Sequence, residues 1–201
     1  MSATPPVYSQ SLPRPINHYA NVLTPDEWNT CQDLLRRPQW QFGGKTVTGG
    51  VGEPHWYMEL ANETFFTETV LQRIQTITKV PFFVSRIYAN GQTYGMDGRY
   101  HQDDMRDHAW TFILYTTDIT ATEPHMLPHQ VYLFGGQTEF SIPGAVADHV
   151  AGRRIVSIHP FPNTGVLFQS HMFHRGLSPH RYVTQLRTTV AFKLFEQVNT
   201  P

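Results

Sequence analysis

The sequence predicts a mainly β protein of the α+β class, with a double-stranded β-helix (jelly-roll) core buttressed by helices near the N-terminus. Two helical patterns come first, and about seven or eight short strands follow them along the chain. Fifteen Pro and fourteen Gly residues supply the turns that short strands need. A chain of 201 residues provides for one sizeable core, so we expect an extended arm over residues 1–20 and a single domain over residues 21–201.

The first helix is expected to begin just after Thr24. Thr24 can cap it, Pro25 suits the first helical position, and Glu27 completes a capping box. Apolar residues then recur at helical spacing, namely Trp28, Cys31 and Leu35. A second helix is expected over residues 62–79, and its apolar stripe consists of Phe66, Val70, Ile74 and Ile77. We interpret both stripes as surfaces that pack against the core.

From Pro81 onward the pattern changes to short runs rich in β-branched and aromatic residues. Turn-forming pairs such as Asn90-Gly91 and Pro143-Gly144 separate these runs. The expected strands cover residues 82–88, 110–115, 131–134, 138–142, 154–158, 166–168 and 188–195. Many short strands after a helical segment favour an antiparallel barrel or jelly roll with helices on one side.

The composition excludes several classes of protein. A formal net charge of −1 provides no overall basic field for nucleic acid or for an anionic membrane. Cys31 is the single cysteine, which rules out an internal disulfide and a thiolate metal cluster. The first fifteen residues lack the apolar core of a signal peptide, and no apolar stretch is long enough to span a membrane. We therefore expect a soluble, cytoplasmic protein.

A candidate metal motif lies just before the strand expected from residue 110. His101 and Asp103 are two residues apart, so on an extended chain their side chains point to the same face and can hold one ion together. Two imidazoles and one carboxylate suit Fe(II) and leave coordination positions open for chemistry. A second imidazole must come from a distant strand, and both His171 and His174 follow the apolar run that ends at Phe168.

A candidate carboxylate anchor opens the last expected strand. Arg187 and Thr189 share one face of that strand by the period of two. A guanidinium can bind a carboxylate through two parallel hydrogen bonds, and a neighbouring hydroxyl can add a third. The apolar residues around Arg187 favour its burial over a surface position, and a buried arginine requires an anion.

Six segments between Ser85 and Phe195 occur in an order that is similar to one known family. They are Arg86-Ile87-Tyr88 with Asn90 to Tyr94, His101-Gln102-Asp103, Thr111 to Tyr115, Gly135 to Phe140, Gly165 to Phe168 with His174, and Arg187-Thr188-Thr189. In these segments the chain resembles the Fe(II)/2-oxoglutarate-dependent dioxygenases, especially their prolyl-4-hydroxylase-like branch. The resemblance implies Fe(II) as the metal, with 2-oxoglutarate and O₂ as co-substrates. It also implies His174 as the third ligand, because in the family this ligand falls six residues after the Phe that ends the strand.

The resemblance also implies roles for residues around the metal motif. Arg187 and Thr189 would hold the distal carboxylate of 2-oxoglutarate, Tyr115 would lie beside them, and Tyr88 would lie near the metal-chelating end. The implied reaction hydroxylates an unactivated C–H bond and converts the oxo acid to succinate and CO₂. For both tyrosines the alternative interpretation is an aromatic residue of the β core.

The substrate is less well defined than the chemistry. The family suggests a prolyl residue in a peptide or protein first, and a free amino acid or other small molecule as the alternative. Candidate substrate contacts flank the metal motif and are Tyr94, Arg99, Asp104 and Arg106. Residues 120–130, which contain two Pro and two His, form either a lid over the substrate or a plain surface hairpin.

Two further functions remain open, together with the oligomeric state. One is oxidative demethylation of nucleic acid by the same iron chemistry, which the neutral net charge disfavours. The other is a jelly roll that binds a metal without turnover. The Arg187 and Thr189 pair argues against this second function, because a protein that only binds a metal has no use for an oxo-acid anchor.

Overall fold

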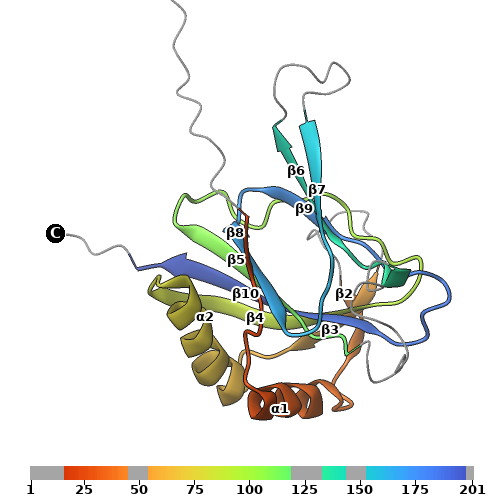
Figure 1. Cartoon of the computed structure of the whole chain (residues 1–201), viewed down its shortest axis with the longest axis horizontal. Helices are drawn as coiled ribbons and strands as arrows, with labels where there is room; N and C mark the ends of the chain where they lie inside the picture. Colours follow the sequence, from red (N-terminus) through yellow and green to blue (C-terminus); the bar gives the residue numbers. More distant parts are fainter. Residues whose placement is uncertain (1–15, 45–53, 119–132, 144–152, 198–201) are drawn as a thin grey trace, which may run out of the picture.

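The strands form two antiparallel sheets in the computed structural model, which describes residues 16–44, 54–118, 133–143 and 153–197 (Figure 1). In spatial order, the large sheet consists of β1 (Asn17–Tyr19), β8 (Thr164–Gln169), β5 (Ala109–Tyr115), β10 (Arg187–Glu196), β4 (Phe82–Gln92), β3 (His55–Glu59) and β2 (Gln41–Gly44). The small sheet consists of β7 (Arg153–Ile158), β6 (Thr138–Pro143) and β9 (Phe173–Gly176). This mainly β arrangement is consistent with the predicted jelly roll.

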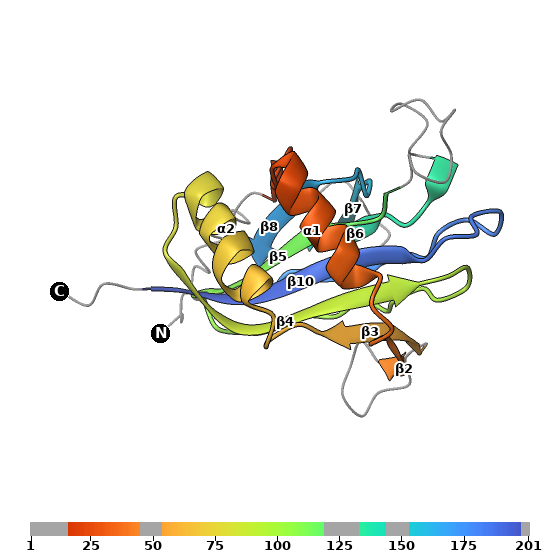
Figure 2. The same cartoon turned by 90° about the horizontal axis from the view of Figure 1, so that it is seen from below.

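The two expected helices are present and cover one face of the large sheet (Figure 2). Helix α1 (Pro25–Leu35) begins with the predicted capping box, in which Thr24 Oγ1 accepts a hydrogen bond from the Glu27 amide at 3.3 Å and Glu27 Oε2 accepts one from the Thr24 amide at 2.8 Å. The second helical segment starts as the π-helix η1 (Phe65–Val70) and continues as α2 (Leu71–Thr78). The predicted apolar stripes are buried against the sheet, so their interpretation as core is confirmed.

Alternating residues of the large sheet supply two separate cores. Phe112 and Leu114 of β5 pack in the cluster that contains the helices, whereas Ile113 and Tyr115 pack in a second cluster with Phe140 of the small sheet. This alternation follows from the two-residue period of a strand. The small sheet therefore packs on the face of the large sheet that the helices leave uncovered.

Four strands were not expected from the sequence, and one expected strand is wrong. Strands β1, β2, β3 and β9 are short and lack a run of alternating apolar residues, so their pairing with longer neighbours decides their conformation. Strand β1 lies within the segment expected to be an arm and pairs with β8. Of the strand expected over residues 131–134, Leu133 and Phe134 form a helical turn instead, and the other two residues lie outside the described ranges.

The loop at residues 120–130 and most of the N-terminal arm lie outside the described residues. Among the helices of the described part, none has both the length and the apolar character needed to cross a membrane.

Candidate metal centre

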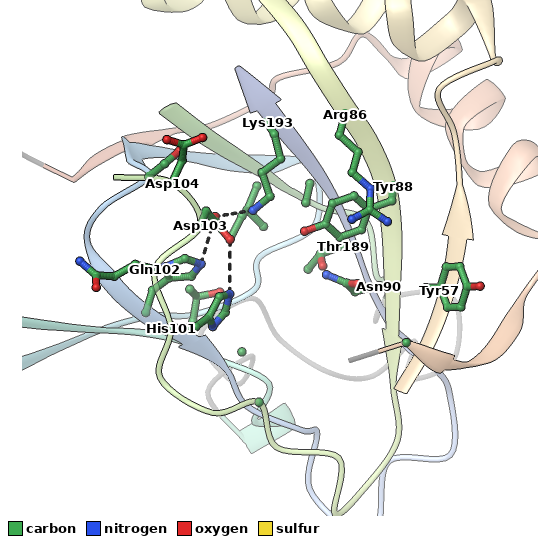
Figure 3. A pocket seen from close by; sticks show the side chains of 18 of the residues that line it. Tyr57, Arg86, Tyr88, Asn90, His101, Gln102, Asp103, Asp104, Thr189 and Lys193 are labelled. Atoms are coloured by element: carbon green, nitrogen blue, oxygen red, sulfur yellow. Dashed lines mark hydrogen bonds and ion pairs between the residues drawn. The ribbon is translucent and has the colours of Figure 1, made fainter. Parts of the chain in front are cut away.

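Three potential ligands meet where the loop before β5 approaches strand β9 (Figure 3). His101 Nε2 lies 3.4 Å from Asp103 Oδ1, and His174 Nε2 lies 3.4 Å from Asp103 Oδ2. One nitrogen or oxygen atom from each of these side chains lies within 4.8 Å of the others. Such a cluster of two imidazoles and one carboxylate could hold a metal ion while leaving other coordination positions free.

Backbone hydrogen bonds hold the three residues in place. The amide of His101 donates to the His174 carbonyl at 3.0 Å, and the amide of His174 donates to the His101 carbonyl at 3.0 Å. The Asp103 amide donates to the carbonyl of Ser170 at 2.8 Å. The structure therefore brings His174 to the motif, whereas the His171 side chain lines no part of the adjoining cavity.

Each imidazole is oriented by a main-chain carbonyl two residues earlier in the chain. Nδ1 of His101 lies 2.9 Å from the Arg99 oxygen, and Nδ1 of His174 lies 2.9 Å from the Met172 oxygen. A carbonyl oxygen only accepts, so both Nδ1 atoms carry the proton and both Nε2 lone pairs face Asp103. Metal-binding histidines are commonly fixed in this way.

The charges of the cluster favour ligand-competent protonation states. Burial disfavours the charged carboxylate of Asp103, but the neighbouring ammonium of Lys193 outweighs burial, and the pKa of Asp103 lies well below the usual range. Burial lowers the pKa of His174 to about 4, although Asp103 opposes this shift. Thr111 Oγ1 also donates to Asp103 Oδ2 at 2.6 Å and fixes the carboxylate from β5.

Lys193 of β10 is a member of the site that the sequence analysis missed. Its ammonium forms an ion pair with Asp103 Oδ2, and its side chain is 19% exposed. Burial disfavours the charged ammonium, but the neighbouring Tyr88 and Asp103 raise the pKa of Lys193. The available signal was the period of two along the last strand, because Arg187, Thr189 and Lys193 all face the cavity.

The cluster opens into a cavity of about 720 Å³ on the face of the large sheet opposite the helices. Its walls include alternate residues of β4 and β10, among them Tyr88 and Thr189. Of the four candidate substrate contacts, Asp104 lines this cavity and forms an ion pair with Arg106 at 2.6 Å. The side chains of Tyr94, Arg99 and Arg106 are not part of its lining.

Arg187 is the first residue of β10, and its side chain is buried. Its side chain donates from Nε to the Gly136 carbonyl at 2.7 Å and from Nη1 to Gln92 Oε1 at 2.6 Å. Burial lowers its pKa to about 10, which leaves the guanidinium charged at neutral pH. No carboxylate among the described residues pairs with it, so its charge is free to bind a carboxylate from outside the protein.

The surroundings of Arg187 are shaped to admit such an anion. A Cβ at Gly136 would lie 2.9 Å from both Cδ and Nε of Arg187, so a glycine there leaves the guanidinium room. The hydroxyl of Tyr115 is fully buried near Arg187 and has no hydrogen-bond partner among the described groups. Burial raises the pKa of Tyr115 to about 12, so this hydroxyl keeps its proton and can donate it to a bound carboxylate.

The depressed pKa of His174 makes the metal-free protein sensitive to acid. The unfolded chain binds a proton near pH 6.5 that the folded chain does not bind until about pH 4, so stability falls as the pH falls through this window. We expect His174 to account for a loss of about 2 kcal/mol in the free energy of unfolding between pH 7 and pH 4.5. Urea unfolding in a chelator at pH 7 and pH 4.5 measures it. An equally steep dependence in His174→Gln would contradict the assignment.

Solved structures of oxygenases share this fold. A prolyl-4-hydroxylase from Pseudomonas putida is 16% identical, with a TM-score of 0.56 over 91% of this chain and 93% of that one. A prolyl hydroxylase from Trichoplax adhaerens, in complex with a peptide fragment of the hypoxia inducible factor oxygen degradation domain, is 12% identical, with a TM-score of 0.57 over 90% of this chain and 84% of that one. The epimerase SnoN, in complex with Fe3+, α-ketoglutarate and nogalamycin RO, is 11% identical, with a TM-score of 0.57 over 90% and 78%.

In comparisons of sequence, no family model and no curated protein matches the chain. The likeness to these solved structures shows that the chain has the fold of the 2-oxoglutarate oxygenases, as the resemblance in its sequence predicts.

Proposed function

We propose that this chain is an Fe(II)- and 2-oxoglutarate-dependent dioxygenase that hydroxylates an unactivated C–H bond. The proposal depends above all on one combination of features. A cluster of two histidines and one aspartate opens into the same cavity as a buried arginine that has no carboxylate partner among the described residues. A metal-binding module without turnover would explain the cluster, but it would leave the buried charge of Arg187 without a counter-ion.

The fit of the residues to Fe(II) follows from their donor atoms. His101, Asp103 and His174 would hold the metal through two Nε2 atoms and one carboxylate oxygen. When bound, the iron supplies activation of O₂, coupled to oxidative decarboxylation of 2-oxoglutarate, for oxidation of a substrate C–H bond. The protein contributes fixed imidazole tautomers and a carboxylate held by Thr111, so the ligands are in place before the metal arrives.

The fit to 2-oxoglutarate follows from the enclosed end of the cavity. Arg187 retains N–H groups beyond those that bond Gly136 and Gln92, and these would donate to the distal carboxylate of the oxo acid. Thr189 and Tyr115, which are paired across β10 and β5, would add hydroxyl donors beside it. Tyr88 lines the cavity on β4 and would lie toward the metal end.

Two substrate classes remain candidates for this site. A prolyl residue in a peptide or protein is the first, supported by the likeness in fold to prolyl hydroxylases. A free amino acid or other small molecule is the second, supported by the charged groups of the cavity wall, including Arg86 and Lys193. Nucleic-acid demethylation has less support, because the chain carries a net charge of −1.

An anaerobic titration tests the proposed function directly. Fe(II) and then 2-oxoglutarate are added to the purified protein while the visible spectrum is recorded. We expect a weak charge-transfer band that saturates at one equivalent of each, because the oxo acid would chelate the bound metal. A protein that binds Fe(II) by calorimetry but develops no band with excess 2-oxoglutarate would contradict the proposal.

Removing the hydroxyl that holds Asp103 should weaken metal binding without removing a ligand. In Thr111→Val the hydrogen bond of 2.6 Å to Asp103 Oδ2 is lost, while the volume of the side chain is kept. We expect the Kd for Fe(II) or Mn(II) to rise roughly tenfold, the lower end of the range for such supporting residues. Thr116→Val removes a hydroxyl that is equally buried in the same strand region but bonds Thr188, so it serves as the control. Equal metal affinity in the two variants would refute the role of Thr111.

A further inference from the structure

A second cationic group faces the cavity of the proposed dioxygenase, well away from the Arg187 anchor. Lys193 lies six residues beyond Arg187 on the same face of β10, which places their backbones about 20 Å apart along the strand. The head groups also contact different parts of the protein, since Arg187 bonds Gly136 and Gln92 whereas Lys193 contacts Asp103. The distal carboxylate of an oxo acid bound at Arg187 therefore cannot also contact Lys193.

The charges around the cavity do not cancel once the proposed ligands are bound. Among the described lining residues, Glu59 pairs with Arg86 and Asp104 pairs with Arg106, which leaves Asp103 opposite two cations, Arg187 and Lys193. A divalent metal and the dianionic oxo acid would neutralise each other. One positive charge then remains in a largely buried site, and such a charge calls for an anion.

The position of Lys193 determines where that anion would bind. Its ammonium contacts the carboxylate of the triad, so it lies directly beside the position of the metal (Figure 3). The guanidinium of Arg86 stacks over the ring of Tyr88 at 4.4 Å, and the ammonium of Lys193 lies 5.7 Å from the same ring. Lys193 and Arg86, whose charge is matched by Glu59, therefore lie on either side of Tyr88 on one wall of the cavity. A substrate anion bound by Lys193 would therefore lie close to the metal, and so close to the substrate C–H bond that is oxidised.

From this arrangement we propose that the substrate is a compact carboxylic acid whose carboxylate is bound by Lys193, with Arg86 closing the outer side. This inference rests on the proposed function and narrows it to the small-molecule class, of which free or N-acylated amino acids are examples. An internal prolyl residue of a peptide carries neutral amides on both sides of its ring. It would leave the ammonium of Lys193 in the buried wall without a full counter-charge.

The test compares acids with their neutral amides in the absence of turnover. Protein loaded with Mn(II) and 2-oxoglutarate is mixed with the free and the N-acetylated L-amino acids, each beside its C-terminal amide, and the Tm is recorded. We expect at least one acid to raise the Tm, and its amide to bind at least about tenfold more weakly by calorimetry. If no acid raises the Tm, or if acid and amide bind equally, the inference is overturned.

Variants test whether Lys193 is the residue that binds the carboxylate of the substrate. We expect Lys193→Met to weaken binding of the acid by about tenfold or more while the amide is unaffected, and Lys193→Arg to retain the preference for the acid. Lys79→Met removes a lysine at the exposed end of α2 and is the control. Wild-type affinity for the acid in Lys193→Met would show that the acid chelates the metal instead, and would overturn the inference. Binding of 2-oxoglutarate to the wild type is measured first. If the wild type does not bind 2-oxoglutarate, the proposed function fails, and this outcome is distinct from failure of the inference about Lys193.

Discussion

Replacement of His174 by alanine is expected to abolish iron-dependent turnover, whereas His171→Ala is expected to keep most of it. His174 directs Nε2 toward Asp103 from strand β9, while the His171 side chain lies outside the cavity lining. Loss of one of three ligands should weaken metal binding by more than the roughly 10- to 100-fold that is typical for loss of a supporting residue. His101→Ala and Asp103→Ala are expected to behave like His174→Ala for the same reason.

Calorimetry with Mn(II) and a succinate assay with Fe(II) measure these effects separately. The two histidines lie three residues apart, His171 in the turn before β9 and His174 in β9, so His171→Ala is a matched control for general damage to this segment. Loss of metal binding in His171→Ala, with His174→Ala still metallated, would reverse the assignment of the third ligand.

The second large effect is expected at the carboxylate anchor. Arg187→Ala should raise the Kd for 2-oxoglutarate by roughly tenfold to a hundredfold, because it removes a charge-assisted pair of hydrogen bonds from a buried position, worth about 1.5–3 kcal/mol. The Kd for the metal should change far less, since Arg187 contacts Gly136 and Gln92 and none of the triad. Arg187→Lys should bind 2-oxoglutarate with intermediate affinity, because it keeps the charge and loses the planar fork.

The control for this experiment is a salt-bridged arginine remote from the cavity. Arg73 pairs with Glu27 between the two helices, so Arg73→Ala tests the effect of losing a guanidinium elsewhere. Titration of the metal-free protein with Mn(II), followed by titration of the metal-loaded protein with 2-oxoglutarate under anaerobic conditions, gives the two constants. Unchanged affinity for 2-oxoglutarate in Arg187→Ala would place the anchor at another residue.

The sequence predicted the elements whose own residues carry a strong pattern. Both helices have capping signals or an apolar stripe of the right period, and the long strands β4, β5 and β10 contain runs of β-branched and aromatic residues. The short strands carry no such pattern. Strand β2, for example, ends in Gly43 and Gly44 and is extended because it pairs with β3.

The residues of the candidate site were likewise predictable from the sequence only where a local pattern identifies them. His101 and Asp103 are close in sequence, so their shared face follows from strand geometry alone. The residues did not decide between His171 and His174, because that choice depends on where β9 begins and on its pairing with His101. Lys193 was missed because the period of two along β10 shows only that it shares a face with Arg187 and Thr189, whereas its role depends on a contact with Asp103 that forms on folding.

The paired hydrogen bonds between His101 and His174 have a consequence for the order of folding. These residues belong to distant parts of the chain, and they meet only after β9 of the small sheet has docked beside the loop that precedes β5. All three ligands therefore come together only in the native fold, and we expect a bound metal ion to stabilise that state. Interactions that form after the transition state slow unfolding and leave the folding rate nearly unchanged. We therefore expect the ion to slow unfolding, because it would link the loop before β5 to strand β9 of the small sheet.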